Sequence, residues 1–279
     1  MIKRILIPTD GSEYGKTAIE YGIYLAGKLN AHITGLHVVD VRLLQPPLIT
    51  DISGTMSLPL YQEFMPSIEN SLDERAEAIL RSFRDRCRET GLSYDAKKTI
   101  GVIEEMIIEE ARSADWIIMS QRGEHFRLGE GGILGSITES VVQASGRPVI
   151  VTPAAFRTIE KMALAYDGSP PADKALIMAA KLASLMAWPL HTVIITDNQQ
   201  TVYDLSERLN AFLSNLQIKN EMTILHGKEN RQLIKFIEGG SVQLLVMGAY
   251  GHNKLRRLLL GSTTSFVIRK SSIPVLLTR

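Results

Sequence analysis

The chain has 279 residues, of which 45% are hydrophobic and 22% charged, so two domains of ordinary size with apolar cores are expected. A net charge of +1 gives no electrostatic case for nucleic acid as the main partner, and the single cysteine excludes a disulfide framework. No apolar run approaches the length of a membrane span. We therefore expect a soluble, cytoplasmic protein with no membrane or nucleic-acid partner.

The first predicted element is a short strand at residues 5–7, which leads into the turn Pro8-Thr9-Asp10-Gly11-Ser12. A strand and a turn ending in Tyr-Asp-Gly-Ser recur at residues 162–169. Each turn is followed by an apolar stripe with helical spacing and then by a second strand, which ends in residues 36–40 and 193–197 respectively. Asp10 and Asp167 lie 157 positions apart, and the elements that follow keep this offset. The order indicates a tandem duplication.

Further along the chain the offset falls to 126, so the first half carries about 31 extra residues, which fall largely in residues 41–70. We expect an irregular insertion there, with the second helix beginning near Ser71 and its counterpart at residues 202–216. Loops of this length in compact domains are usually functional or mobile. The insertion is expected to be a lid or a docking surface, with a surface excursion of no particular role as the alternative.

The remaining elements alternate between strand and helix in both halves. Third strands are predicted at 95–100 and 221–225, third helices at 103–112 and 230–237, fourth strands at 116–119 and 244–247, and last strands at 149–152 and 275–278. Apolar strands alternating with helices predict a parallel sheet that is covered on both faces. The ligand crevice of such a sheet lies at the carboxyl ends of its strands.

A glycine-rich segment follows the fourth strand of the second half. It contains Gly248, Gly251, Gly261 and then Ser262-Thr263-Thr264, after which a helix is predicted. A strand, a glycine loop and a helix N-terminus together are typical of a phosphate site, because backbone N–H groups and the helix dipole favour an anion. The alternative is that the glycines only turn the chain. The sequence contains neither a Walker GxxxxGK[ST] motif nor a Rossmann GxGxxG after its first strand.

The spacing Gly248-x2-Gly251-x9-Gly261-Ser262 resembles the ATP-binding signature of the universal stress protein family. The Ile-Leu-Ile-Pro-Thr-Asp-Gly-Ser opening, the Leu-His-Val-Val-Asp second strand and the Pro-Val-x-x-x-Thr ending extend the resemblance over essentially the whole chain. The resemblance implies an α/β fold of two tandem, doubly wound, five-stranded parallel sheets of the adenine-nucleotide alpha-hydrolase-like type, with strand order 3-2-1-4-5. It also implies domains at 1–155 and 156–279.

The same resemblance implies an adenine-nucleotide site in the second half. Asp167 would lie near the adenine and ribose, and the backbone of Ile195 would read the adenine edge. Tyr250 stands where family members often carry arginine, and Tyr166 would either stack on the base or crowd it out. The residues implied for this site are Ala165, Tyr166, Asp167, Ile195, Met247, Gly248, Gly251, Gly261, Ser262, Thr263 and Thr264.

The first half departs from the signature. Ser120 replaces the first glycine, eleven residues rather than nine separate Gly123 from Gly135, and Glu124 and Glu130 add negative charge. We therefore expect a site that binds ATP weakly, differently or not at all. Its residues would be Pro8, Thr9, Asp10, Val38, Ser120, Arg122, Gly123, Gly135, Ser136 and Ile137.

The roles of several other polar residues can be interpreted in two ways. Asp10 and Asp167 could be metal or ribose ligands, or could cap the helices that follow them. Lys254, Arg256 and Arg257 could neutralise phosphate charge or form a solvated basic face. The histidines show no metal-ligand pattern, and Cys87 is expected to be unreactive.

Three functions are consistent with these residues. The first is an ATP-binding stress-response regulator that acts through conformation or through docking of an unidentified protein partner. The second is a slow ATPase or autophosphorylating enzyme, in which Asp167 and Ser262 hold Mg²⁺. The third is a binding module for a non-nucleotide ligand in the first half. The family resemblance also implies that the two last strands pack together as an intramolecular pseudo-dimer that imitates a family dimer, which leaves further homodimerisation open.

Overall fold

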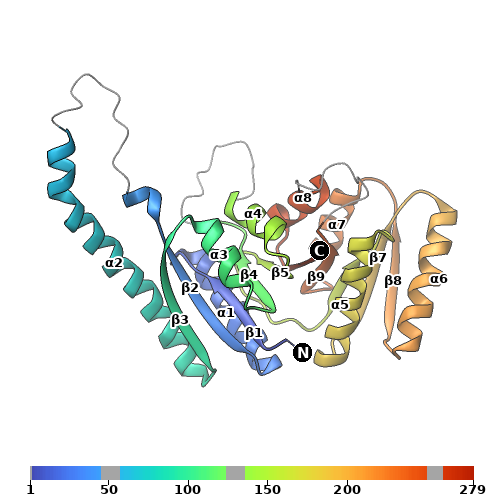
Figure 1. Ribbon diagram of the computed structural model, residues 1–279. Helices are drawn as coiled ribbons and strands as arrows, with labels where there is room; N and C mark the ends of the chain where they lie inside the picture. Colours follow the sequence, from blue (N-terminus) through green and yellow to red (C-terminus); the bar gives the residue numbers. More distant parts are fainter. Residues whose placement is uncertain (1, 45–56, 124–135, 250–259) are drawn as a thin grey trace.

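The structure is a computed structural model that describes residues 2–44, 57–123, 136–249 and 260–279; of residues 57–64 and 136 it describes the backbone only. Ten of its strands form one sheet in the order β3-β2-β1-β4-β5-β10-β9-β6-β7-β8. Figure 1 shows the strands of the two halves side by side, with helices on both faces of the sheet.

The elements follow the predicted alternation in both halves. The first half contains β1 (Arg4–Pro8), α1 (Glu13–Leu29), β2 (His32–Asp40), the 3-10 helix η1 (Val41–Leu44), α2 (Ser57–Thr90), β3 (Tyr94–Gly101), α3 (Ile103–Ala111), β4 (Trp116–Ser120), α4 (Ser136–Ala144) and β5 (Val149–Thr152). The second half contains β6 (Met162–Ala165), α5 (Pro170–Met186), β7 (Leu190–Ile195), α6 (Gln199–Asn215), β8 (Asn220–Leu225), α7 (Glu229–Glu238), β9 (Leu244–Gly248), α8 (Ser262–Lys270) and β10 (Val275–Thr278).

Each half has its strands in the order third, second, first, fourth and fifth, and neighbouring strands within a half are parallel. The predicted doubly wound α/β fold with order 3-2-1-4-5 is therefore confirmed. The halves meet where β5 and β10 pair antiparallel, with Val151 opposite Val275 and Val149 opposite Leu277. The predicted pairing of the two last strands is confirmed as well.

Two apolar layers form because successive strand residues point to opposite faces of the sheet. In β1, Ile5 and Ile7 enter the layer that is covered by α1, α2, α5 and α6, whereas Leu6 enters the layer covered by α3, α4, α7 and α8. All three side chains are at most 2% exposed. Strands that are buried on both faces explain the continuous apolar runs in the sequence.

The expected irregular insertion is wrong in part. Residues 41–44 form η1, and α2 begins at Ser57, about four turns before the predicted start near Ser71. Pro59 occupies the third helical position, where a missing N–H removes no intrahelical hydrogen bond. Pro66 lies inside the helix, which the general rule against helical proline does not anticipate. Residues 45–56, the rest of the insertion, lie outside the described chain.

Two tyrosines of α1 hold the segment that joins the halves. The hydroxyl of Tyr21 donates to the carbonyl of Ala155 (3.3 Å) and accepts from the amide of Arg157 (3.1 Å). The hydroxyl of Tyr24 makes the same pair of bonds with the backbone of Ile159, at 2.9 and 3.1 Å. Phe156 packs against both rings. The joining segment is therefore attached to the first half along its length.

Replacing Tyr21 by phenylalanine should lower the free energy of unfolding by about 1–2 kcal/mol, because a fully buried hydroxyl with two backbone bonds is lost. Denaturant unfolding measures the change. Tyr203→Phe is the matched control, since the Tyr203 side chain is 63% exposed and its hydroxyl reaches water. Equal effects of the two substitutions would contradict the role given to the Tyr21 hydroxyl.

Candidate functional site

The name second-half crevice is used here for the carboxyl edge of the sheet at which three neighbouring strands of the second half end. β6 lies between β7 and β9, and their last residues are Ala165, Ile195 and Gly248. Ala165 and Ile195 are partly buried and pack on the same apolar layer, and Met247 in that layer is 6% exposed. The fold thus brings four of the implied residues to the carboxyl edge of one sheet, as expected for a parallel α/β sheet.

Asp167 lies in the turn between β6 and α5, and its carboxylate supports that turn. Its Oδ1 accepts a hydrogen bond from the amide of Ser169 at 2.9 Å, and Gly168 between them has a φ of +75°, which favours glycine. The helix itself is capped by Ser169, whose hydroxyl accepts from the amide of Ala172. The interpretation of Asp167 as the cap of α5 is therefore wrong, because Ser169 caps this helix.

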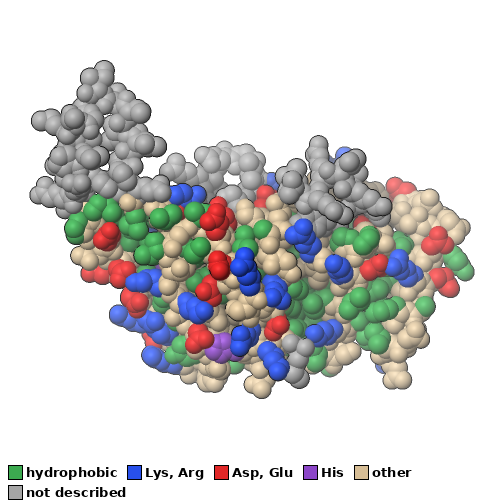
Figure 2. All heavy atoms as spheres, in the orientation of Figure 1, with side chains coloured by type: hydrophobic (Ala, Val, Ile, Leu, Met, Phe, Trp, Pro, Cys, Tyr) green, Lys and Arg blue, Asp and Glu red, His purple; other side chains and the backbone are tan. Residues whose placement is uncertain are grey.

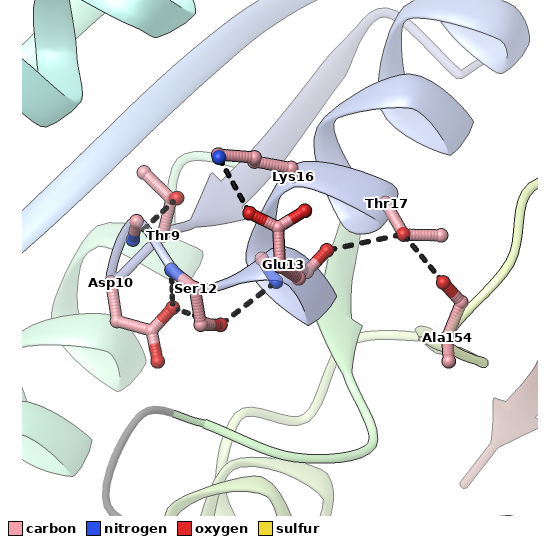
Figure 3. Close-up of polar contacts among 9 residues, drawn as sticks. Thr9, Asp10, Ser12, Glu13, Lys16, Thr17 and Ala154 are labelled. Atoms are coloured by element: carbon pink, nitrogen blue, oxygen red, sulfur yellow. Dashed lines mark hydrogen bonds and ion pairs between the residues drawn. The ribbon is translucent and has the colours of Figure 1, made fainter.

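The first half repeats this geometry. Asp10 Oδ1 accepts from the amide and the hydroxyl of Ser12 at 3.0 and 2.7 Å, and Gly11 has a φ of +80°. Ser12 then caps α1 by accepting from the amide of Gly15 at 3.0 Å. Figure 3 shows these contacts together with the bond from Thr17 to the carbonyl of Ala154 in the joining segment. The two turns are structural equivalents, as the offset of 157 predicts.

The ring of Tyr166 lies away from the other residues implied for the base. It is 2% exposed and enters the apolar layer under α5 and α6, whereas Ala165 and Ile195 pack on the opposite layer. Its hydroxyl donates to Oδ1 of Asp173 at 2.7 Å, and Arg208 binds the other oxygen of that carboxylate. Burial raises the pKa of Tyr166. Neither stacking on a base nor crowding it out fits this placement; the ring is a core residue.

Gly248 is required for packing between β9 and α5. A Cβ at this position would lie 2.7 Å from Pro171 Cβ, 2.8 Å from the carbonyl carbon of Pro171 and 2.9 Å from the amide nitrogen of Ala172. Contacts this short do not occur for real Cβ atoms, and two of the three involve backbone that cannot turn aside. For Gly248, close approach of a helix therefore explains the glycine without any ligand.

The N-terminus of α8 begins at a residue that has no side chain with which to cap it, and no side-chain cap is present among the described residues. Gly261 is its N-cap residue, and no acidic residue stands in the first turn. Ser262 is exposed, Thr263 is partly exposed, and Thr264 is 3% exposed. The hydroxyl of Thr263 donates to Oε2 of Glu229 at 3.3 Å. Amides without a capping side chain, next to hydroxyl groups, form a polar helix end suited to an anion.

Part of the signature lies outside the described residues. This applies to Gly251, to Tyr250 and to the basic residues Lys254, Arg256 and Arg257. In the first half it applies to Gly135 and to the side chain of Ser136. The roles predicted for these residues stay predictions.

The first-half crevice has different chemistry. Ser120 at the end of β4 donates through its hydroxyl to the carbonyl of Arg122 at 2.8 Å. The guanidinium of Arg122 lies over the ring of Tyr14, 5.6 Å from its centre. A Cβ on Gly123 would lie 3.0 Å from Oδ2 of Asp10, so the residues directly after β4, residues 121–123, pass close to the aspartate turn. These three residues are called the β4 loop below.

The other first-half residues implied by the signature surround these groups. Pro8 and Val38 are partly buried, as is Ile137 in α4, which packs with Val38 on the layer under α3 and α4. Thr9 is 6% exposed, and its carbonyl bonds to Nδ1 of His37 at 2.8 Å.

Sequence reasoning missed three residues near these crevices. Glu229 begins α7 and reaches Thr263, Tyr14 lies beneath Arg122, and Gln121 makes a contact between the halves. An acidic residue just before a predicted helix is a recognised start signal, so Glu229 could have been noticed. Nothing in the sequence spacing marks Tyr14 or Gln121.

The cysteine and the other titratable side chains of the described residues suggest no additional reactive or metal site. Burial raises the pKa of the Cys87 thiol to about 12, so almost no thiolate forms at neutral pH, in agreement with the expected lack of reactivity. Within the described ranges, no three His, Cys, Asp or Glu side chains gather as a metal site, and no helix is long and apolar enough to cross a bilayer. Figure 2 shows acidic and basic side chains interspersed over the face drawn.

Comparisons of the sequence and the structure with those of known proteins point to the same family. The model of the "Universal stress protein family" matches residues 1–153 and 158–279. Universal stress protein Slr1230 of Synechocystis is 31% identical over 285 residues, covering 99% of each chain. Universal stress protein MJ0577 of Methanocaldococcus jannaschii is 29% identical over 157 residues, covering 54% of this chain and 94% of its own. The crystal structure of a universal stress protein from Archaeoglobus fulgidus superposes with a TM-score of 0.76 at 22% identity, covering 99% of this chain and 96% of its own.

Proposed function

The chain belongs to the universal stress protein family, and we propose that it is a stress-response regulator that binds ATP in the crevice of its second half. Occupancy of the crevice would alter the conformation of the chain or the docking of a protein partner. The division into domains at 1–155 and 156–279 and a cytoplasmic location are part of the proposal. The two family matches support the first, and the single free cysteine supports the second.

One observation carries the nucleotide proposal. The helix α8 begins at the N-cap residue Gly261, which has no side chain to cap it, and Ser262 and Thr263 stand at its first turn. This helix end follows a glycine segment with the spacing of the family's ATP signature. The three preceding strand ends and the Asp167 turn lie at the same edge of the sheet. A phosphate chain at α8 and a ribose near Asp167 would therefore occupy one continuous crevice.

The arrangement favours binding over fast turnover. Oδ1 of Asp167 already supports its own turn, which suits a fixed ribose acceptor better than a mobile general base. The Thr263 hydroxyl lies 3.3 Å from Oε2 of Glu229, which is longer than the roughly 2.6–3.2 Å reach of a general base that would activate it as a nucleophile. We therefore assign no catalytic role to these residues and expect a bound nucleotide to persist.

The proposal is tested by titrating nucleotide-free protein with ATP in a calorimeter. We expect about one site per chain, because the first half lacks the signature. Gly261→Val should abolish binding, because the new side chain would stand at the helix end where the phosphate is proposed to lie, and the backbone at Gly261 (φ −58°, ψ 144°) accepts any residue. The melting temperature without nucleotide reports whether the variant keeps its fold. No heat of binding at millimolar ATP would contradict the proposal. Hydrolysis of the titrated ATP would move the assignment to an ATPase.

Replacing Glu229 by glutamine should tighten ATP binding about threefold, because the carboxylate that bonds to Thr263 would repel a phosphate at the same helix end. Adenosine, which has no phosphate, should bind the variant and the wild type equally. Glu238→Gln at the far end of α7 is the matched control. Weaker binding of ATP with Mg²⁺ by the Glu229 variant would mean instead that this carboxylate holds the cation.

A further inference from the structure

One buried side chain crosses the seam between the two halves. The side chain of Gln121, directly after β4, donates through Nε2 to the carbonyl oxygen of Ser271 at 2.8 Å. Gln121 is 6% exposed and Ser271 is 4% exposed. Ser271 is the residue that ends α8, the helix whose first turn forms the proposed phosphate end of the second-half crevice. The contact thus joins the first-half crevice to a helix of the second.

The antiparallel pairing of the last strands creates this contact. It places the carboxyl end of β5 beside the amino end of β10, where the chain turns from α8 into the sheet. The amide of Gln121 donates to the carbonyl of Thr152 at 3.0 Å, which fixes its backbone at the end of β5. The Ser271 hydroxyl bonds to both the carbonyl and the amide of Ile273, so the turn that receives the glutamine is itself held.

The bond from Gln121 to the end of α8 has no counterpart at Ala249, the equivalent position of the second half. Ala249 follows β9 as Gln121 follows β4, and its amide donates to Thr278 at 2.8 Å just as that of Gln121 donates to Thr152. Its methyl group has no donor, so it cannot form the corresponding bond to the turn at Ser145 that follows α4. The duplicated fold explains the backbone bonds at both places, and the glutamine side chain adds a buried connection to α8. On the other side of the seam, the side chain of exposed Arg279 bonds to the carbonyl of Gln143 in α4.

One end of the connection lies at the first-half crevice, and the other lies at the end of α8 opposite to Ser262. Gln121 stands between Ser120 and Arg122, whose mutual hydrogen bond shapes the β4 loop, and the carbonyl of Ser120 also accepts from Thr138. The helix α8 has nine residues and is therefore roughly 13 Å long, with Ser271 at one end and Ser262 at the other. A shift of the β4 loop must therefore either carry α8 with it or leave the buried Ser271 carbonyl without its donor, which is costly.

We infer that Gln121 is a positioning residue through which the first-half crevice sets the nucleotide affinity of the second half. The inference rests on the proposed function, since it concerns the same ATP site. In this account, the first half regulates ATP binding in the second half and is not simply a second ATP site of lower affinity. The coupling is reciprocal, so nucleotide in the second half must also bias the β4 loop.

The test uses Gln121→Met, which keeps the length of the side chain and removes its donor. Hydrogen exchange of the α8 amides, measured without nucleotide, should become faster, and ATP should bind three- to tenfold more weakly. Thr152→Val is the matched control. It removes a buried hydroxyl bond to the carbonyl of Met119 at the same seam, but one that stays within the first half. The control should lose stability with no change in α8 exchange or ATP affinity.

The outcomes separate the inference from the proposed function. Wild-type protein that binds no ATP contradicts the proposed function, and the α8 exchange rates still decide whether Gln121 holds the helix. ATP binding with equal affinity in the wild type and the Gln121 variant contradicts the coupling alone. Equal losses of affinity in the Gln121 variant and the Thr152 control would also overturn it, because any destabilisation of the seam would then have the same effect.

Discussion

Gly248→Ala should lower the free energy of unfolding by about 3 kcal/mol and the melting temperature by about 5–10 °C, in the absence of any nucleotide. The new Cβ would lie 2.7–2.9 Å from Pro171 and Ala172 at the start of α5, and two of the three contacts are with backbone atoms. β9 or α5 would have to move to relieve them. Thermal and denaturant unfolding of the nucleotide-free protein measure the loss.

Gly27→Ala is the matched control for this substitution. Gly27 lies in α1, and a Cβ there would meet nothing within 4 Å. The same change should therefore raise stability by about 0.5–1 kcal/mol, because glycine in a helix costs that much relative to alanine. A Gly248 variant as stable as the wild type that fails only to bind ATP would show that this glycine serves the ligand, contrary to the packing account.

Asp167→Asn should weaken ATP binding about tenfold or more, because a hydrogen bond from a ribose hydroxyl to a charged acceptor contributes about 1.5–3 kcal/mol. Asparagine retains an oxygen that accepts from the amide of Ser169, so the turn and the fold should persist. Calorimetric titration gives the dissociation constant, and the melting temperature without nucleotide reports on the fold.

Asp10→Asn is the equivalent substitution in the first half. Its turn has the same geometry, so any general effect of losing the charge on stability should be shared by the two variants. Only the Asp167 variant should lose affinity for ATP. If instead Asp10→Asn weakens binding and Asp167→Asn does not, the nucleotide occupies the first half and the assignment of the site is wrong.

The order of the elements could be predicted because it depends on local signals that recur. Apolar runs of strand length, turn residues and serine caps recur in both halves, and most observed strands differ from the predicted ones by at most two residues. The exceptions are β2 and β7, which begin four and three residues before the segments that marked them. Pairing of the last strands followed from the family resemblance. Each of these features is fixed by short segments whose burial pattern can be read from the sequence.

The errors arose where distant parts of the chain meet. The face taken by Tyr166 depends on the alternation of side chains across β6, which places its ring with Leu164 and away from Ala165. The role of Gly248 depends on how closely α5 approaches β9, and a glycine pattern cannot distinguish a helix from a ligand as the reason for that space. Gln121 is unremarkable in sequence, because its partner lies 150 residues away across an antiparallel seam.

The early start of α2 has a different cause. Its first turns contain two prolines, which local rules read as loop, yet Pro59 falls where a helix tolerates it. The rest of the helix places Ala76, Leu80, Phe83 and Cys87, all at most 1% exposed, against the sheet. Packing along this stripe outweighs the weak local preference at the N-terminal end of the helix.

The most direct test of the account is to denature freshly purified wild-type protein and identify any released nucleotide by chromatography and mass. We expect up to one ATP per chain, absent from Gly261→Val prepared in the same way. Two nucleotides per chain would contradict the assignment to the second half alone, and ADP alone would favour an ATPase. No nucleotide, together with no binding of added ATP at millimolar concentration, would contradict the central claim that the second-half crevice is an ATP site.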